Sequence, residues 1–137
     1  MRIFFDTNVL LDVALRREPH VARSEEVLAD AIENHRCFLS WHTISNIAYI
    51  MGRLTGEREA LTFIEEITKI CTIAPVEHKD LSVAFQHNGG DFEDAMQIAS
   101  AMAIQAELIV TRDPGGFDQS PIPLSDPSSS MSLRKSV

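Results

Sequence analysis

Four aspartates of this chain stand where their carboxylates could act together. Asp91 and Asp94 begin a predicted helix over residues 91–106. Asp94 continues the apolar stripe of that helix, because residues three and four apart share a helical face. Asp6 directly follows a predicted buried strand, and Asp113 comes just after another. Carboxylates are almost never buried without compensation, since removing them from water is costly. We therefore expect these four acids to face a positive charge.

A divalent cation is the compensating charge that fits these residue types best. Two like charges about 4 Å apart repel by ~4 kcal/mol at an effective dielectric of 20, whereas a small domain has only ~5–15 kcal/mol of stability. Oxygen donors without a nearby histidine or cysteine favour Mg²⁺ or Mn²⁺ over Zn²⁺. One or two such ions can hydrolyse a phosphodiester by activating water and stabilising the leaving oxygen. The acids therefore predict a metal-dependent phosphodiesterase site.

Three of the four acids also have a structural interpretation. Asp6 could cap the helix that follows it, and Asp91 could be the N-cap of its own helix. Asp113 lies in "TRDPGGF", where Asp-Pro-Gly-Gly is a strong turn signal. Asp94 lies beyond the cap position and on the apolar face, so these alternatives do not cover it. The shared position at strand ends favours the metal site.

The elements that would position these acids alternate along the chain. This alternation predicts a three-layer α/β/α sandwich with a mainly parallel central sheet, in which ligands bind beyond the carboxyl ends of the strands. Glu93, Gln97 and Ser100 are predicted to lie away from the apolar stripe of their helix. Apolar runs predict strands over 2–5, 37–39, 71–76 and 107–111, with at most a short edge strand in 120–127, and amphipathic spacing predicts helices over 7–17, 19–34, 41–55, 57–70, 77–88 and 91–106.

Length and composition predict one domain. At 137 residues the chain can form a single core over residues 1–127, followed by a Ser-rich tail, 128–137, that we expect to be disordered. No apolar run reaches the roughly 18 residues that span a bilayer. The two cysteines, Cys37 and Cys71, lack metal-ligand spacing, which predicts reduced thiols in a cytoplasmic protein.

The formal net charge is −8, from 12 basic and 20 acidic residues. An acidic balance by itself argues against a nucleic-acid-binding protein, whose usual feature is a basic face. A cation that neutralises the acid cluster, or a basic partner chain that covers it, would remove this objection.

Three segments together resemble the PIN domain, specifically the VapC-like toxin ribonucleases. They are "FFDTNVLLD" (4–12), "DFEDAMQIASA" (91–101) and "LIVTRDPGGF" (108–117). The resemblance extends to about residue 127 and implies a parallel-sheet α/β/α sandwich. It implies that metal-binding catalytic aspartates stand at Asp6, Asp94 and Asp113, that Asp91 assists them, and that the hydroxyl groups of Thr7 and Thr111 orient the carboxylates.

The chain departs from the family pattern at two positions. Many members carry a glutamate where "SWHTISNIAYIM" has Asn46. An amide oxygen can coordinate Mg²⁺, but it brings no negative charge and cannot act as a base. The second departure is Gly116, before Phe117, where an aspartate is common in the family.

The resemblance also implies a function and partners. It implies an Mg²⁺- or Mn²⁺-dependent endoribonuclease, the toxin of a toxin–antitoxin pair, that leaves a 5′-phosphate and a 3′-hydroxyl. An antitoxin would lay a basic C-terminal segment across the acidic cleft, and two copies of the chain would form a homodimer. Four arginines could steer RNA or could be solvated helix ends: Arg16, Arg17, Arg53 and Arg112.

Two other functions fit parts of the pattern. Asn46 favours a non-catalytic PIN-like module whose acidic cleft only binds a protein partner. "IFFDTN" also loosely fits phosphoaspartate chemistry, in which an aspartate follows an apolar strand. That chemistry usually needs a second aspartate at the position of Asn8, and a downstream lysine, whereas no lysine lies between Lys79 and Lys135.

Overall fold

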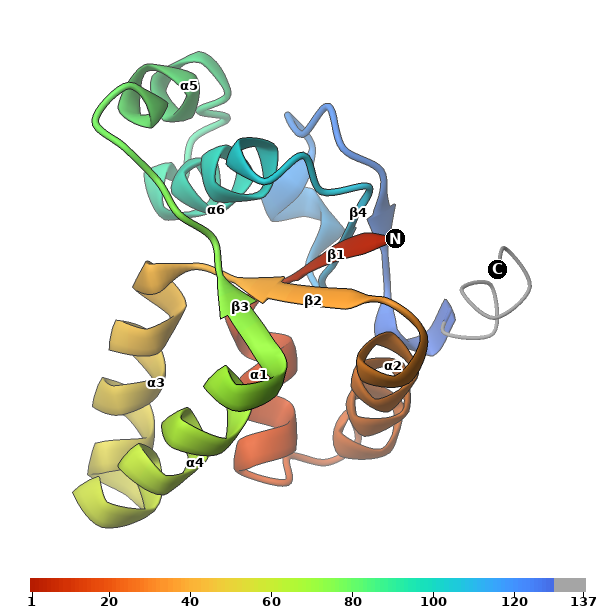
Figure 1. Ribbon diagram of the computed structural model, residues 1–137, viewed down its shortest axis with the longest axis vertical. Helices are drawn as coiled ribbons and strands as arrows, with labels where there is room; N and C mark the ends of the chain where they lie inside the picture. The colour runs from red at the N-terminus through yellow and green to blue at the C-terminus, as the bar shows by residue number, and fades with distance from the viewer. Residues whose placement is uncertain (130–137) are drawn as a thin grey trace.

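The computed structural model describes residues 1–129 and shows a five-stranded sheet between two layers of helices (Figure 1). The strand order is β3-β2-β1-β4-β5, and every pairing is parallel. The elements are β1 (Arg2–Phe5), α1 (Thr7–Ala14), α2 (Val21–Asn34), β2 (Arg36–Leu39), α3 (Trp41–Leu54), α4 (Glu57–Ile70), β3 (Cys71–Ile73), α5 (Asp80–Gln86), α6 (Phe92–Ala103), β4 (Leu108–Val110), the 3₁₀ helix η1 (Pro114–Phe117), β5 (Leu124–Ser125) and the 3₁₀ helix η2 (Pro127–Ser129).

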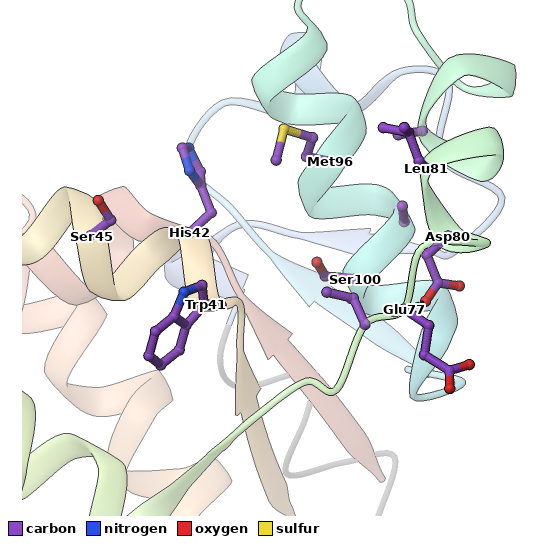
Figure 2. Close-up of a pocket in the computed structure, with 11 residues that line it drawn as sticks. Trp41, His42, Ser45, Glu77, Asp80, Leu81, Met96 and Ser100 are labelled. Carbon is purple, nitrogen blue, oxygen red and sulfur yellow. Dashed lines mark hydrogen bonds between the residues drawn. The ribbon is translucent and has the colours of Figure 1, made fainter.

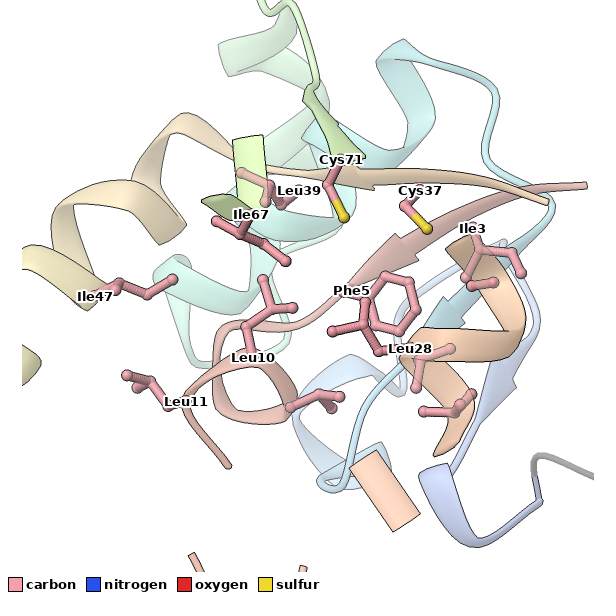
Figure 3. Close-up of a cluster of buried hydrophobic side chains, with 14 of the residues drawn as sticks. Ile3, Phe5, Leu10, Leu11, Leu28, Cys37, Leu39, Ile47, Ile67 and Cys71 are labelled. Carbon is pink, nitrogen blue, oxygen red and sulfur yellow. The ribbon is translucent and has the colours of Figure 1, made fainter. Parts of the chain in front are cut away.

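The parallel sheet confirms the predicted three-layer fold. Helices α1 to α4 cover one face, and α5 and α6 lie on the other (Figure 1). Strand β1 is central and buried on both faces, which explains its continuous apolar run. Ile3 and Phe5 enter the core beneath α1 to α4, while Phe4 enters the core beneath α6. Figure 3 shows the first of these cores.

The two cysteines lie opposite each other in this sheet. Cys37 of β2 is in register with Cys71 of β3. Both cysteines are buried and free. The two cysteines are 34 positions apart in the sequence, but they lie side by side on neighbouring strands (Figure 3).

Several elements are shorter than the sequence predicts. Helix α1 ends at Ala14, so Arg16 and Arg17 lie beyond its last turn, and Arg16 has a positive φ of 51°. Helix α5 covers 80–86 rather than 77–88, and β3 ends at Ile73 rather than at residue 76. Element ends are set by caps and tertiary contacts that periodicity does not report.

The C-terminal part of the chain behaves partly as predicted. The 120–127 segment forms only the two-residue strand β5, at the edge of the sheet. The predicted disordered tail, 128–137, lies mostly outside the described residues, but Ser128 and Ser129 belong to η2, which packs against α2. None of the helices in residues 1–129 combines the length and apolar character that crossing a bilayer requires.

Candidate functional site

The acidic site begins where β1 and β4 end side by side. The backbone N–H of Asp6 donates to the Val110 carbonyl at 3.0 Å, which places Asp6 and Thr111 at the same edge of the sheet. The Thr111 hydroxyl donates to Asp6 Oδ2 at 3.0 Å and accepts a hydrogen bond of 3.0 Å from the backbone N–H of Asp113. Thr111 thereby connects the carboxylate after β1 to the loop after β4.

Helix α6 brings the other two predicted aspartates to this edge. Asp91 is the N-cap residue, and its carboxylate accepts a 3.3 Å hydrogen bond from the backbone N–H of Asp94. The structural interpretation of Asp91 is therefore confirmed. Asp6 has extended backbone geometry before α1, but its side chain makes no cap hydrogen bond. Its carboxylate is used by Thr111 instead.

Gly116 shows how closely Asp94 and Asp113 approach each other. A Cβ atom at position 116 would collide with Asp94 Oδ2 and would lie 3.2 Å from Asp113 Oδ2. Carboxylates from α6 and from the loop after β4 therefore border the same glycine. The absence of a side chain at this position, where the family commonly has an aspartate, leaves the space that the Asp94 carboxylate occupies.

Burial and like charge both act on these acids. Burial raises the pKa of Asp94 to about 7, and the neighbouring charges of Asp91, Asp6, Asp113 and Glu93 act in the same direction. Burial also raises the pKa of Asp6. The hydrogen bond from Thr111 and the Thr7 backbone N–H oppose that rise, whereas the charges of Asp113 and Glu93 add to it.

Glu93, beside Asp94 in the sequence, makes a contact with α3 that the sequence pattern missed. Helical spacing predicts a solvated acid, and the Glu93 side chain is indeed 55% exposed. Its Oε1 nevertheless lies 3.4 Å from Asn46 Nδ2 and 3.5 Å from His42 Nε2, both on α3. The contact joins residues 47 positions apart, so no local spacing could have revealed it.

A buried polar network lies beneath the acids and corrects the prediction for α6. Gln97 and Ser100, predicted to face away from the apolar stripe, are buried. Gln97 Nε2 donates to Thr7 Oγ1 at 3.0 Å and to Thr43 Oγ1 at 3.3 Å, and the two threonine hydroxyls are 2.8 Å apart. Ser40 joins the network through Thr43. Thr7 thus links α1 to α3 and α6, directly after Asp6.

Two of the four candidate RNA-steering arginines are bound to a buried acid instead. Asp12 is fully buried, and Arg112 contacts both of its carboxylate oxygens, at 2.6 and 3.1 Å. Arg17 donates to Asp12 Oδ1 at 3.0 Å, and Ser24 donates to Oδ2 at 3.2 Å. Because Arg112 stands between Thr111 and Asp113, this ion pair anchors the loop that carries Asp113.

The remaining two arginines lie on the surface. Arg16 pairs with Glu25 at 3.2 Å, and Arg53 donates to the Tyr49 hydroxyl at 3.0 Å. Both contacts are exposed, so neither guanidinium is held as firmly as that of Arg112.

The acidic side chains lie near one another, but they do not form a complete set of metal ligands in their present conformations. Within residues 1–129, no three acidic, histidine or cysteine side chains are arranged to hold an ion as they stand. The donors around Gly116 are carboxylate oxygens, and the nearby imidazole of His42 contacts Glu93. This donor set fits Mg²⁺ or Mn²⁺ better than Zn²⁺.

A groove of about 430 Å³ lies between α3 and helices α5 and α6 (Figure 2), and His42, which contacts Glu93, is part of its lining. Trp41 and His42 of α3 lie on one side, and Met96 of α6 and Leu81 of α5 lie on the other. Trp41 is 67% exposed. The lining is mostly apolar and contains Glu77 and Asp80 but no lysine or arginine. Such a surface suits a ligand with apolar and basic groups.

Gly116→Ala tests the close approach of the two carboxylates. We expect it to lower the free energy of unfolding by about 1–2 kcal/mol, because the new methyl group must push Asp94 aside. Urea unfolding would measure the change. The control is Gly52→Ala in α3, where a Cβ meets nothing within 4 Å and where alanine should stabilise the helix by about 0.5–1 kcal/mol. Equal stabilities of Gly116→Ala and the unmodified chain would contradict the geometry.

Comparisons with known proteins agree with this architecture. VapBC2 from Rickettsia felis, solved with a DNA fragment from its promoter, matches with a TM-score of 0.73 and 15% identity, over 92% of this chain and 98% of that one. VapBC-1 from nontypeable Haemophilus influenzae matches with a TM-score of 0.72 and 14% identity, over 93% and 99% of the two chains. The sarcin-ricin loop cleaving toxin VapC20 from Mycobacterium tuberculosis matches with a TM-score of 0.64 and 15% identity, over 78% and 86%.

At these identities the likeness is one of fold. No curated protein matches the sequence of this chain. The sequence profile of the PIN domain, however, matches residues 2–114, which include Asp6, Asp94, Asp113 and the elements that position them. The chain therefore belongs to the PIN domain family.

Proposed function

We propose that this chain is a metal-dependent endoribonuclease, the toxin of a toxin–antitoxin pair. The observation that carries the proposal is the meeting of Asp94 and Asp113 at Gly116, next to the buried Asp6. Acids placed so that each raises another's pKa destabilise a fold unless a cation neutralises them. The PIN domain profile and the VapC-like fold support a nuclease.

Each aspartate of the site would have a different role in binding the ion. Asp6 would be the most constrained ligand, because the Thr111 hydroxyl holds one of its carboxylate oxygens. Asp94 and Asp113 face each other across Gly116, and Asp91 adds negative charge at the N-terminus of α6. Bound Mg²⁺ or Mn²⁺ would supply an activated water and stabilise the leaving 3′-oxygen of an RNA phosphodiester.

Supporting groups would keep the carboxylates in place. Thr7 anchors the start of α1 through Thr43 and Gln97, and Arg112 anchors the Asp113 loop through Asp12. Neither Thr7 nor Arg112 needs to contact RNA to have these effects. Preorganised ligands of this kind lower the cost of gathering like charges around an ion.

The proposed protein partner is an antitoxin with a basic C-terminal segment. Several of the most similar folds were solved as VapBC complexes. In this chain the groove between α3 and helices α5 and α6 has apolar walls, Glu77 and Asp80 on its rim, and no lysine or arginine. A segment with apolar and basic side chains would therefore be complementary to both the groove and the aspartates.

A homodimer is the second proposed assembly. Trp41 and Tyr49 of α3 and Phe85 of α5 are each more than 60% exposed. Large aromatic side chains at the surface of a small acidic protein favour burial against another copy. Analytical ultracentrifugation would measure the association.

The direct test is RNA cleavage by the purified chain. We expect cleavage in Mn²⁺ or Mg²⁺, none in EDTA, and products with a 5′-phosphate and a 3′-hydroxyl. The termini would be identified by ligation and by phosphatase sensitivity. Cleavage that persists in EDTA, or products with a 2′,3′-cyclic phosphate, would refute the metal-dependent mechanism.

A non-catalytic binding module is the alternative that one observation favours, namely the neutral Asn46 in place of a carboxylate. The two functions differ in their response to metal. An ion at 100 times its Kd stabilises a protein by about 2.7 kcal/mol. Thermal unfolding with millimolar Mn²⁺ should therefore show a clear upward shift for the nuclease and none for the binding module.

A further inference from the structure

The two cysteines of the chain lie next to each other in the sheet and take no part in the acidic site. Cys37 is in β2, Cys71 is the first residue of β3, and the two are in register between parallel strands. Both side chains belong to the core beneath α1 to α4, so both point to the same face of the sheet (Figure 3). The fold has therefore brought together two buried, free thiols.

The spacing of the strands places these thiols within reach of a disulfide bond. Neighbouring strands lie about 4.8 Å apart, which is the separation expected between the Cα atoms of an in-register pair. Cysteines joined by a disulfide have Cα atoms roughly 4.4–6.8 Å apart and Cβ atoms roughly 3.5–4.5 Å apart. Because side chains on one face of parallel strands project in the same direction, the Cβ atoms here keep nearly the strand spacing. A bond therefore requires a small approach of one strand, and the resulting strain makes it easy to reduce.

Strand β3 is able to make this approach because it lies at the edge of the sheet. It has three residues and, among the described strands, pairs with β2 alone. Cys71 directly follows Ile70, the last residue of α4, so it stands at the junction of a helix and a strand. Such ends of elements open locally at a lower cost than the centre of a sheet. Strand β2, in contrast, is held by β1 on its other side.

The two thiols differ in acidity and are open only to a small reagent. The neighbouring Cys71 thiol lowers the pKa of Cys37, whereas Cys37 and burial raise the pKa of Cys71. Since the thiolate is the reactive form, Cys37 is expected to react first. Cys37 is 4% exposed and Cys71 is 2% exposed, which excludes a bulky oxidant. Hydrogen peroxide is small enough to enter when the edge strand opens.

We propose that Cys37 and Cys71 form a redox-sensitive pair, which hydrogen peroxide converts to a disulfide that ties β3 to β2. The Cys37 thiolate attacks one oxygen of the peroxide, which gives the sulfenic acid of Cys37 and hydroxide, and the hydroxide takes up the Cys37 proton as water. Cys71 then attacks this sulfur, and its proton leaves with the hydroxyl group as a second water. The two thiols lose two electrons, which reduce one peroxide to two waters. The inference does not rest on the proposed nuclease function.

The bond would also change one wall of the groove between α3 and helices α5 and α6. The backbone N–H of Ala74 donates to the Leu39 carbonyl at 2.8 Å, so the segment after β3 continues to follow β2. Val76 and Glu77 of this segment line the groove together with Trp41, the single tryptophan of the chain. A shift of β3 should therefore change the fluorescence emission of Trp41.

The experiment treats the purified full chain with an equimolar amount of hydrogen peroxide, unfolds it in N-ethylmaleimide and measures its mass. We expect the loss of two hydrogen atoms, no maleimide adduct, and a linked pair of peptides that contain Cys37 and Cys71. Trp41 emission should change with peroxide and return with dithiothreitol, which reduces a disulfide but does not restore oxidised methionine. Cys37→Ala and Cys71→Ala are the matched controls, since each keeps a small apolar side chain but cannot form the bond. Their emission should not respond to dithiothreitol.

The peptide map decides the outcome even where an alanine variant does not fold. Two maleimide-reactive thiols after the treatment, a sulfinic acid at Cys37 without a link to Cys71, or a link between two chains would each overturn the proposal. A link within one chain that leaves Trp41 emission unchanged would overturn the connection between the cysteine pair and the groove.

Discussion

Asp94→Asn is expected to reduce metal-dependent RNA cleavage by at least about a hundredfold. Asp94 is the predicted acid that the helix-cap and turn alternatives do not explain, and its carboxylate borders that of Asp113 at Gly116. Asparagine preserves the size of the side chain but removes one negative charge from the ion site. Rates of cleavage of a single-stranded RNA at saturating Mn²⁺ would measure the loss.

The control for charge removal is Asp118→Asn. Asp118 is exposed and lies just after η1, outside the set of carboxylates that raise the pKa of Asp94. It should retain full activity. Undiminished cleavage by Asp94→Asn would show that this carboxylate is not part of the reaction.

Asp94→Asn, although it should abolish activity, is expected to stabilise the metal-free protein. The pKa of Asp94 is raised from 3.8 to about 7 in the folded chain, so folding favours the protonated form. Its contribution to stability is therefore present below about pH 4 and is lost as the pH rises through about 7. Asp94→Asn should raise the free energy of unfolding at pH 8.5 by about 1–2 kcal/mol, after allowance for solvent screening, and should change it little at pH 4.

Denaturant unfolding in EDTA at the two pH values would test this sign. A stabilisation that is larger at pH 4 than at pH 8.5 would contradict the raised pKa. The combination of lost activity with gained stability would identify Asp94 as a residue kept for function rather than for folding.

Asp12→Asn is expected to lower the free energy of unfolding by about 3 kcal/mol. Asp12 is fully buried and holds the guanidinium groups of Arg17 and Arg112. Removing the central charge leaves both arginines without their counter-charge. The estimate is at the low end for a broken buried pair, because side-chain exposures of 35% and 27% let the arginines regain some water. Urea unfolding would measure the loss.

Glu25→Gln provides the surface control for this ion pair. It removes the acid that pairs with Arg16, whose side chain is 75% exposed, and should change stability by less than about 1 kcal/mol. Asp12→Asn should in addition reduce cleavage, because Arg112 would no longer fix the loop that carries Asp113. Equal stabilities of the two variants would show that the buried pair does not anchor this loop.

The class of fold and the edge of the sheet at which the main acids gather could both be predicted from the pattern of residues. The apolar runs before Asp6 and before Thr111 mark strands buried on both faces, and alternation with helices requires those strands to be parallel. Parallel strands that end together bring the residues after them together, so the neighbourhood of Asp6 and Asp113 follows from pattern and topology alone. Asp94 could be predicted as a site residue because an acid on the apolar face of a helix, beyond the cap position, has no structural role there.

The contacts between polar groups of separate elements could not be predicted in this way. Gln97 and Ser100 read as solvated positions, yet both are buried, and Gln97 hydrogen-bonds to threonines of α1 and α3. Arg17 and Arg112 read as surface cations, but one buried acid binds both. Periodicity reports which face of an element is apolar, whereas the burial of a polar group depends on the other element that packs on it. For Glu93 and Asn46, and for Arg112 and Asp12, that partner lies 47 and 100 positions away, a distance that no local pattern spans.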